Sequence, residues 1–331
     1  MTRPPPPPAP EQAEAALARL EGHIVTTPVR RWIPDTVGST PPEDAEIFLK
    51  LELFQRTGTF KARGALTNIL GAEAEAVASG VTAVSAGNHA IAVAYAARSA
   101  GTTARVVILE SANAARVERC RNYGAEIEFA PDGASGFARA REIEADEGRL
   151  FIHPFEGERT VLGTSTVAVE LDRQVGELDA VVVPCGGGGL LAGVAAVTKA
   201  LRPGCAVYGV EPTGADSMRR SLDAGEPVSI DAVHTIADSL GAPHAAPYSF
   251  SLVQEFVDDV VLVGDGEIRA AMRALFEDAK LVTEPASATP YAAVCGPLRD
   301  RLKGRRVGLV VSGSNIDLDT FAGHLRSRAA T

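Results

Sequence analysis

The stretch DAVVVPCGGGGLLAGVAAVTKAL, Asp179 to Leu201, decides the fold class of this chain. It begins with a short β-branched apolar run and ends in residues that favour helix, so it predicts a strand followed by a helix. Four consecutive glycines, Gly186 to Gly189, join the two elements. A continuous apolar run is typical of a parallel strand that helices cover on both faces. The stretch therefore predicts an α/β fold.

The same alternation of short apolar runs and helical segments recurs along the chain. A strand is predicted at Ile47–Glu52 and a helix at Phe60–Leu70. Further strand and helix pairs follow: VTAVSAG with NHAIAVAYAARSAG, ARVVIL with NAARVERCRNYG, AEIEFA with SGFARAREIEADEG and AVYGVEP with ADSMRRSLDAG, before the strand RRVGLVVSG. We expect two parallel-sheet α/β domains, a larger one from residues 11–80 and 156–331 and a smaller one inserted at residues 81–155.

The N-terminus and the composition narrow the class of protein. MTRPPPPPAP, residues 1–10, predicts an extended, disordered tail that contributes nothing to the fold. The net charge of −10 argues against nucleic acid or an anionic membrane as the main partner. No apolar run approaches the roughly 20 residues of a spanning helix, and no secretion signal is evident. Four widely separated cysteines predict neither a disulfide framework nor a zinc site, so a cytoplasmic location is expected.

Four glycine- or serine-rich turns follow predicted strands, and they predict one shared cleft. They are SAGNHA, CGGGGL, EPTGADS and SGSN. Ligands of open α/β sheets bind beyond the carboxyl ends of the strands. Consecutive glycines before a helix suit a phosphate group. The alternative is a dinucleotide site, because Gly187, Gly189 and Ala192 fit G-x-G-x-x-A and Glu211 follows 22 residues after Gly189.

A second stretch, TGTFKARGA from Thr57 to Ala65, places Lys61 among apolar and small residues. A desolvated amine has a lowered pKa, which suits attack on a carbonyl group. The alternative is an exposed lysine on a helix. TGTFKARGA, SAGNHA, CGGGGLLAG and SGSN, in this order, resemble the serine/threonine dehydratase family of pyridoxal-phosphate enzymes. The resemblance implies the fold-type-II architecture, a cofactor between two domains and a homodimer.

The resemblance also implies roles for particular residues. Lys61 would form the Schiff base with the cofactor and act as the catalytic base, while Arg63 is expected in a structural ion pair. The cofactor-binding residues would be Phe60, Lys61, Asn88, Gly186, Gly187, Gly188, Gly189, Leu190, Glu284 and Ser312. The substrate would contact Ser85, Ala86, Gly87, Asn88, His89 and Ser239. For Asn88 a plain helix cap, for His89 a packed core histidine and for Glu284 a first-turn acidic residue remain alternatives.

The expected reaction is elimination of water from a 3-hydroxy amino acid such as threonine or serine, which gives a 2-oxo acid and ammonia. Racemases of this family carry a second serine where this chain has Ala86, so racemisation should be weak. Ser239 replaces a family glycine and leaves the substrate open: hydroxyaspartate or another 3-hydroxy amino acid is an alternative, as is serine racemisation. A nicotinamide-dependent oxidoreductase and a catalytically silent cofactor-binding protein are the alternatives from other classes.

EPTGADS resembles a cation-binding turn, with Glu211 and Ala215 in matching positions and Ser217 where an aspartate would stand. A hard divalent cation prefers charged oxygens. A tight magnesium site is therefore not expected, and a monovalent or weakly bound divalent cation remains open.

Overall fold

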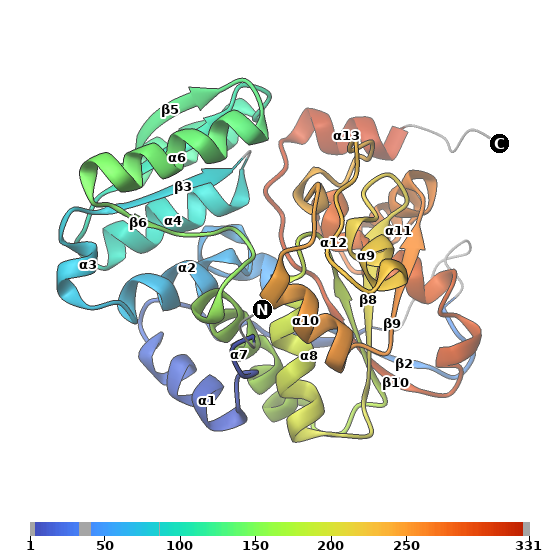
Figure 1. The fold of residues 1–331 in the computed structure, drawn as a ribbon. Coiled ribbons are helices and arrows are strands. Elements are labelled where there is room, and N and C mark those ends of the chain that lie inside the picture. Colours follow the sequence, from blue (N-terminus) through green and yellow to red (C-terminus); the bar gives the residue numbers. More distant parts are fainter. Residues whose placement is uncertain (1–3, 33–40, 86, 327–331) are drawn as a thin grey trace.

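Two separate β-sheets organise the computed structural model, which describes residues 4–32, 41–85 and 87–326 (Figure 1). The larger sheet has the strand order β1-β2-β10-β7-β8-β9, and the smaller sheet has the order β5-β4-β3-β6. Every pairing is parallel except that of β1 with β2. The strands are β1 (Val29–Trp32), β2 (Glu46–Lys50), β3 (Val81–Ser85), β4 (Ala104–Leu109), β5 (Glu126–Ala130), β6 (Leu150–Phe151), β7 (Ala180–Pro184), β8 (Ala206–Pro212), β9 (Asp259–Val263) and β10 (Arg306–Val310).

Helices cover both faces of each sheet, as parallel strands require. The smaller sheet lies between α6 (Gly133–Glu147) on one face and α4 (Asn88–Ser99) with α5 (Ala114–Asn122) on the other. The larger sheet packs on one face against α7 (Glu158–Val175), α8 (Gly189–Leu201) and α10 (Pro247–Phe256), and on the other against α11 (Asp265–Glu277), α12 (Pro285–Cys295) and α13 (Leu318–Arg326). The remaining helices are α1 (Pro10–Arg19), α2 (Lys61–Leu70), α3 (Ala74–Ala78) and α9 (Ser217–Ala224).

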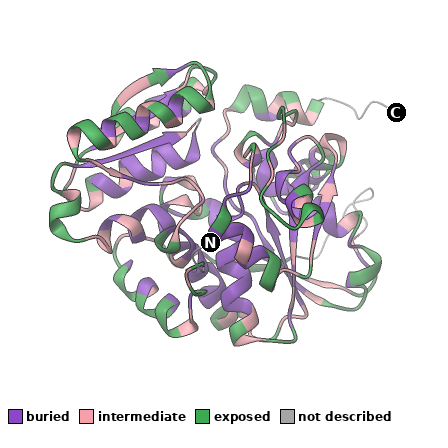
Figure 2. Ribbon diagram, in the orientation of Figure 1, coloured by how far each residue is buried: buried purple, intermediate pink, exposed green. Residues whose placement is uncertain are grey.

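Burial follows from this layering. The central strand β7 is buried along its whole length, and α8 beside it is almost entirely buried, whereas α6 turns an exposed face outward (Figure 2). All four strands of the smaller sheet lie between residues 81 and 151. In the part of the chain that the structure describes, no helix combines the length and the apolar character that crossing a membrane requires.

The N-terminal segment departs from the sequence prediction for residues 1–10. Pro8 is buried, the carbonyl of Pro6 accepts a hydrogen bond of 2.9 Å from the Tyr248 hydroxyl, and α1 begins at Pro10. The prediction that this segment contributes nothing to the fold is therefore wrong for Pro6, Pro8 and Pro10. A proline ring is apolar and its carbonyl still accepts, so an extended segment can pack against a helix such as α10 without regular structure of its own.

Candidate functional site

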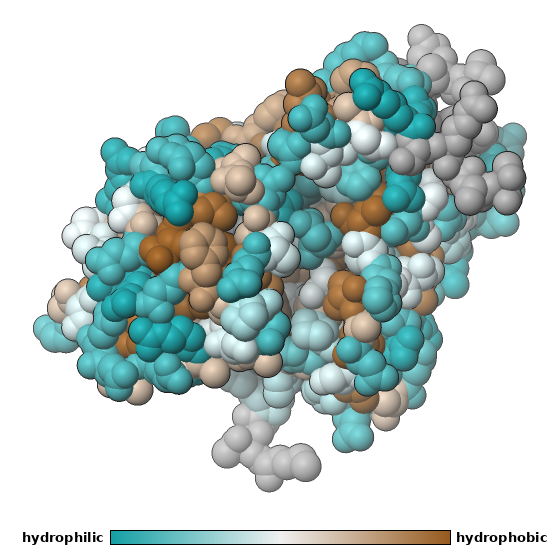
Figure 3. Space-filling view, turned by 90° about the horizontal axis from the view of Figure 1, so that it is seen from above, coloured by the Kyte–Doolittle hydropathy of each residue, from teal (hydrophilic) through white to brown (hydrophobic). Residues whose placement is uncertain are grey.

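A cavity of about 580 Å³ lies between the two domains and is lined by residues of both. It is bounded by residues that follow the carboxyl ends of β3 and β7, by the start of α2 and by the segment after β10. The predicted residues among its lining are Phe60, Lys61, Ser85, Gly87, Asn88, His89, Gly186, Gly187, Gly188, Gly189, Leu190, Ser239, Glu284 and Ser312. The surface seen from above is largely hydrophilic, with hydrophobic residues in separate groups (Figure 3).

Lys61 is placed by a tight turn at the start of α2. Thr57 and Gly58 have positive φ angles of 71° and 76°. The Thr57 conformation is unusual for a residue with a side chain, and its carbonyl accepts a hydrogen bond of 2.9 Å from Asn315 Nδ2. The amide of Phe60 donates to the carbonyl of Ser312 over 3.1 Å. The turn is thereby tied to the segment after β10, which brings two distant parts of the chain to one site.

The Lys61 amine lies inside the protein. Its Nζ donates to the carbonyl oxygen of Pro154 over 2.5 Å. Burial lowers the pKa of Lys61 to about 8, while the charge of Glu284 acts in the opposite direction. Because desolvation disfavours the ammonium form, a substantial fraction of this amine is the free base near pH 8. This is the property that a nucleophilic lysine requires.

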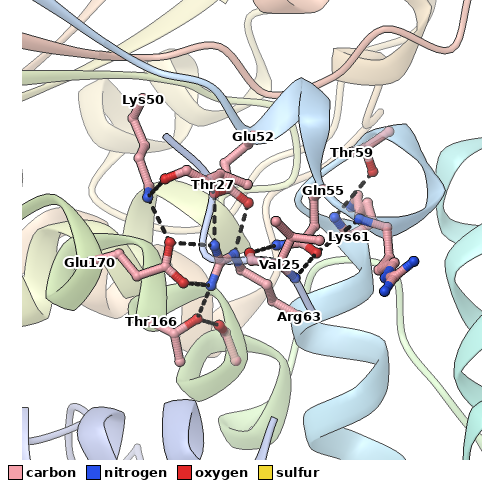
Figure 4. Close-up of polar contacts among 12 residues, drawn as sticks. Val25, Thr27, Lys50, Glu52, Gln55, Thr59, Lys61, Arg63, Thr166 and Glu170 are labelled. Atoms are coloured by element: carbon pink, nitrogen blue, oxygen red, sulfur yellow. Dashed lines mark hydrogen bonds and ion pairs between the residues drawn. The ribbon is translucent and has the colours of Figure 1, made fainter. Parts of the chain in front are cut away.

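Arg63, two residues further along α2, belongs to a buried ion cluster (Figure 4). Its guanidinium donates to Glu52 over 2.7 Å and to Glu170 over 2.8 Å, and Lys50 donates to Glu170 over 2.6 Å. Thr27 donates to Glu52 over 2.5 Å, so the buried carboxylates are extensively hydrogen-bonded. The prediction of a structural ion pair for Arg63 is confirmed. The cluster anchors the helix that begins at Lys61.

The glycine loop ends at the amino terminus of α8, where backbone N–H groups lack partners within the helix. Gly188 is the N-cap of α8 and has a φ of 90°. A Cβ atom on Gly187 would lie 2.2 Å from the Phe155 ring, and one on Gly188 would lie 2.5 Å from Met218 Cε. The Phe155 ring therefore leaves no room for a side chain at Gly187, and the positive φ of Gly188 disfavours one there. Its location at a positive helix end suits an anion.

Asn88 is held on both sides of its amide by residues of the larger domain. Its Nδ2 lies 2.9 Å from both carboxylate oxygens of Glu284 and 3.1 Å from Ser239 Oγ, while its Oδ1 accepts from Asn315 over 2.7 Å. Burial raises the pKa of Glu284 to about 7, against the nearby charge of Arg116. Glu284 is the N-cap residue of α12, but its side chain makes no capping hydrogen bond. Both side chains are thus directed into the site, away from plain capping roles.

Ser312 and His89 complete the predicted lining. The Ser312 hydroxyl is 3.0 Å from the Ser287 hydroxyl, which donates to the carbonyl of Gly313 over 2.7 Å. His89 Nε2 donates to the carbonyl of Ile152 over 2.8 Å, and burial lowers the pKa of His89 to about 3. This imidazole is neutral and buried, and its N–H donates to a backbone carbonyl. These are the features of a histidine that packs in the core rather than of a catalytic base.

Comparison with known proteins identifies the family. Residues 16–313 match the family described as PALP, pyridoxal-phosphate dependent enzyme. The chain belongs to this family of pyridoxal-phosphate-dependent enzymes.

Three relatives illustrate how far the likeness extends. Phenylserine dehydratase from Ralstonia pickettii is 51% identical over 93% of both chains. L-threo-3-hydroxyaspartate ammonia-lyase from Saccharomyces cerevisiae is 36% identical over 92% of both. The structure of maize serine racemase superposes with a TM-score of 0.88, at 34% identity and over 95% of both chains. The predicted family, the fold class of two parallel-sheet α/β domains and the cofactor pyridoxal phosphate are confirmed, and the nicotinamide alternative is set aside.

The residues of the cavity fit pyridoxal phosphate by their chemistry. The group needs a lysine amine for its aldehyde, donors for a phosphate and a partner for its ring nitrogen. The cavity holds one partly buried lysine with a lowered pKa, a glycine loop at a helix amino terminus and a buried serine hydroxyl. Lys61, the loop of Gly186 to Gly189 and Ser312 are therefore the residues that would hold the cofactor.

Two parts of the predicted site stand apart from this cavity or outside the described residues. Ala86 lies outside the described residues. Glu211, Ala215 and Ser217 do not line the cavity. The carboxylate of Glu211 accepts from the amides of Met218 and Arg219 over 2.9 and 2.8 Å, and Ser217 Oγ donates to the carbonyl of Ala242 over 3.0 Å. Among the described residues no group of three or more His, Cys, Asp or Glu side chains could hold a metal ion. A cation at this turn remains a prediction.

The cavity also contains residues that the sequence did not single out. Arg116 of α5 donates to Asp238 over 2.5 Å and to the carbonyl of Asn315 over 3.0 Å. Asp238 stands beside Ser239 in the stretch IADS, residues 236–239, and could have been found there. Phe137 and Phe155 also line the cavity. They lie in a helix and a connecting turn whose approach to Lys61 depends on how the domains pack.

Proposed function

We propose that the protein is a pyridoxal-phosphate-dependent dehydratase that eliminates water from a 3-hydroxy amino acid with an aromatic β-substituent. The elimination reaction rests on the family and on relatives named as dehydratases and ammonia-lyases. The aromatic substrate rests on one observation above all: the cavity that holds Lys61 has an apolar wall formed by Val84, Leu109, Phe137 and Phe155. The relative that is 51% identical is named phenylserine dehydratase.

The charges of the cavity favour an uncharged substituent over an acidic one. Among the described residues, one lysine, Lys61, and one arginine, Arg116, line the cavity. Arg116 is already paired with Asp238 over 2.5 Å and lies 3.8 Å from Glu284. A second carboxylate on the substrate would need a cationic partner in the protein to offset the free-energy cost of its desolvation. We therefore prefer a phenylserine-type substrate to hydroxyaspartate.

The residues of the site divide the chemistry among them. When bound, the cofactor supplies an electrophilic carbonyl group and an electron sink. The backbone amides at the amino terminus of α4, which begins at Asn88, suit the substrate carboxylate. The Lys61 amine, as the free base, accepts the α-proton. The hydroxyl on the β-carbon then takes that proton from the Lys61 ammonium group as its bond to the β-carbon breaks, so that water leaves. The resulting enamine takes up water to give a 2-oxo acid and ammonia.

The experiment is a substrate panel on the purified protein loaded with pyridoxal phosphate. L-phenylserine, L-3-hydroxyaspartate, L-threonine and L-serine are compared by the release of 2-oxo acid and ammonia. We expect kcat/KM for phenylserine to exceed the other values by at least about tenfold, since burying an aromatic ring contributes a few kcal/mol. Lys61→Ala should abolish turnover, and Lys303→Ala, at an exposed lysine, should not.

Two results would contradict the proposal. A preference for hydroxyaspartate would contradict the aromatic substrate class, and D-amino acid that outruns 2-oxo acid in chiral chromatography would contradict elimination. Phe137→Ala tests the apolar wall directly: it should raise KM for phenylserine and leave KM for threonine nearly unchanged. A homodimer, a cytoplasmic location and the boundaries of the domains remain predictions.

A further inference from the structure

The turn His153–Glu156 joins the smaller domain to the larger one and contacts both parts of the cofactor site. It follows β6 and precedes α7. The carbonyl of Pro154 accepts the hydrogen bond of 2.5 Å from Lys61 Nζ. The Phe155 ring lies against the glycine loop, so closely that a Cβ on Gly187 would be 2.2 Å from it. Small displacements of this turn therefore reach the lysine and the loop together.

The carboxyl-terminal end of the turn is fixed by α10. Phe155 O accepts from the Ser249 hydroxyl over 2.7 Å. The carboxylate of Glu156 accepts from the amides of Tyr248 and Ser249 over 2.7 and 3.0 Å, at the amino terminus of that helix. A carboxylate at this position is favoured by the unpaired N–H groups and by the helix dipole.

The side chain of His153 bonds the backbone within the turn itself. Its Nδ1 accepts from the amide of Glu156 over 3.0 Å and from that of Phe155 over 3.3 Å. A ring nitrogen that accepts carries no proton, so the imidazole is neutral and its proton is on Nε2. Burial, with the charges of Arg141, His244 and Lys61, lowers the pKa of His153 to about 3. His153 therefore stays neutral, and this acceptor is retained across the physiological range of pH.

The ring of His153 also packs between two aromatic residues of the apolar wall. Its centroid lies 4.7 Å from that of Phe155, nearly perpendicular at 89°, and 5.6 Å from that of Phe137. One side chain thus contacts the turn backbone through Nδ1 and the apolar wall through its ring. Neither function requires contact with the substrate or the cofactor.

We propose that His153 is a positioning residue, which holds the Pro154 carbonyl against the Lys61 amine and the Phe155 ring against the glycine loop. A neutral amine that donates one N–H to a fixed carbonyl has its lone pair directed by that bond. The turn thereby sets the direction in which Lys61 attacks and accepts protons. The effect on the aromatic end of the cavity rests on the proposed function, whereas the effect on Lys61 does not.

Replacements of His153 separate this role from simple packing. In His153→Asn the side-chain oxygen falls near the place of Nδ1 and can accept from the same two amides. In His153→Gln the oxygen lies one bond further out, nearer the place of Nε2. His153→Leu fills similar volume without any acceptor. A packing role favours Leu over Asn, whereas the positioning role favours Asn over both Gln and Leu.

The first measurement is made on the holoenzymes of the wild type and the three variants. We expect His153→Asn to retain kcat within about threefold, and His153→Gln and His153→Leu to lose about tenfold to a hundredfold, as small misplacements of catalytic groups do. KM for phenylserine should rise in the latter two more than KM for threonine. His324→Asn, on α13 and outside the cavity lining, is the matched control.

The second measurement does not depend on turnover. The cofactor is removed, and the rate at which added pyridoxal phosphate becomes attached to Lys61 is followed by visible absorption and by borohydride trapping at that residue. His153→Gln and His153→Leu should attach it about tenfold more slowly than the wild type, and His153→Asn at nearly the wild-type rate. Equal rates in all variants, or His153→Asn as slow as His153→Leu, would overturn the proposal. If no panel substrate turns over, the proposed function fails, and this rate still decides the role of His153.

Discussion

At the scale of single residues, the buried ion cluster around Arg63, two residues from Lys61, should contribute strongly to the free energy of unfolding. Arg63 holds the carboxylates of Glu52 and Glu170 within 2.7 and 2.8 Å, and none of these side chains is appreciably exposed. Arg63→Met would leave Glu52 without its guanidinium and Glu170 with Lys50 alone. We expect a loss of about 3–5 kcal/mol in the free energy of unfolding, measured in urea. Arg31→Met, at the exposed Arg31–Glu46 pair, should cost under about 1 kcal/mol. Similar losses in both variants would contradict a structural role for the cluster.

Glu284 gives the site a pH dependence that can be measured without the cofactor. Its pKa is raised from near 4.5 in the unfolded chain to about 7 by burial. The folded protein therefore holds this proton more tightly, and the contribution to stability is complete below pH 4.5 and is lost as pH rises to about 7. The wild type should thus lose stability relative to Glu284→Gln between those values, in urea titrations of the cofactor-free protein. The lowered pKa of Lys61, about 8, acts only at higher pH. A constant difference between the two proteins across this window would show that Glu284 is ionised throughout.

At the scale of elements, the glycine loop is constrained by shape as well as by function. Gly188 combines a φ of 90° with a space that Met218 Cε closes to 2.5 Å for any added Cβ. Gly188→Ala should lower the free energy of unfolding by about 1–3 kcal/mol and weaken cofactor binding, because the loop must move. Gly204→Ala is the matched control, since that glycine is exposed and an added Cβ there meets nothing within 4 Å. Unchanged cofactor affinity in Gly188→Ala, by titration of the visible absorption, would show that the loop does not hold the cofactor.

The elements that the sequence predicted well carry local signals. The strand, glycine turn and helix around Gly188 appear together in one contiguous stretch, and the helix predicted at Phe60–Leu70 corresponds to α2, Lys61–Leu70. Strand β1 (Val29–Trp32) was not predicted, because two exposed arginines interrupt its apolar pattern at the edge of the sheet. The run of prolines at residues 4–8 led to the prediction of a solvated segment. No local sequence pattern indicates that Pro8 is buried in the folded protein.

The parts of the site that the sequence did not predict depend on contacts between distant segments. Arg116 and Asp238 form their ion pair although 122 positions separate them in the sequence. The residues next to either one in the sequence do not indicate that it has this partner. Phe155 reaches Gly187 only because the turn after β6 lies against α10. Family resemblance supplied Asn88 and Glu284 as separate residues, whereas their mutual hydrogen bond comes from the packing of the two domains.

At the scale of the whole molecule, the cavity exists only where the smaller domain docks on the larger one. Besides the pair of Asn88 and Glu284, the docking relies on α5 of the smaller domain. Arg116 bridges to Asp238, and Asn113, the N-cap of α5, donates to Asp317 over 2.6 Å. Arg116 and Asp238 also line the cavity, and the side chain of Asp238 is half exposed.

This arrangement predicts that the docking of α5 on the larger domain depends on the Arg116–Asp238 ion pair. In Arg116→Gln the bond to a charged partner is lost, and hydrogen bonds of this kind contribute about 1.5–3 kcal/mol. Amide hydrogen exchange in residues 114–122 should therefore become at least about tenfold faster, with little change in the strands of the larger sheet. Arg121→Gln is the matched control, because Arg121 is an exposed residue of the same helix and pairs only with Glu118 over 3.6 Å among the ion pairs of the described residues. High salt should accelerate the exchange in the wild type more than in Arg116→Gln, since the Asp238 end of the pair is open to solvent. If Arg116→Gln and Arg121→Gln exchange alike, the docking of α5 on the larger domain relies on its other contacts, such as that of Asn113 with Asp317, rather than on Arg116.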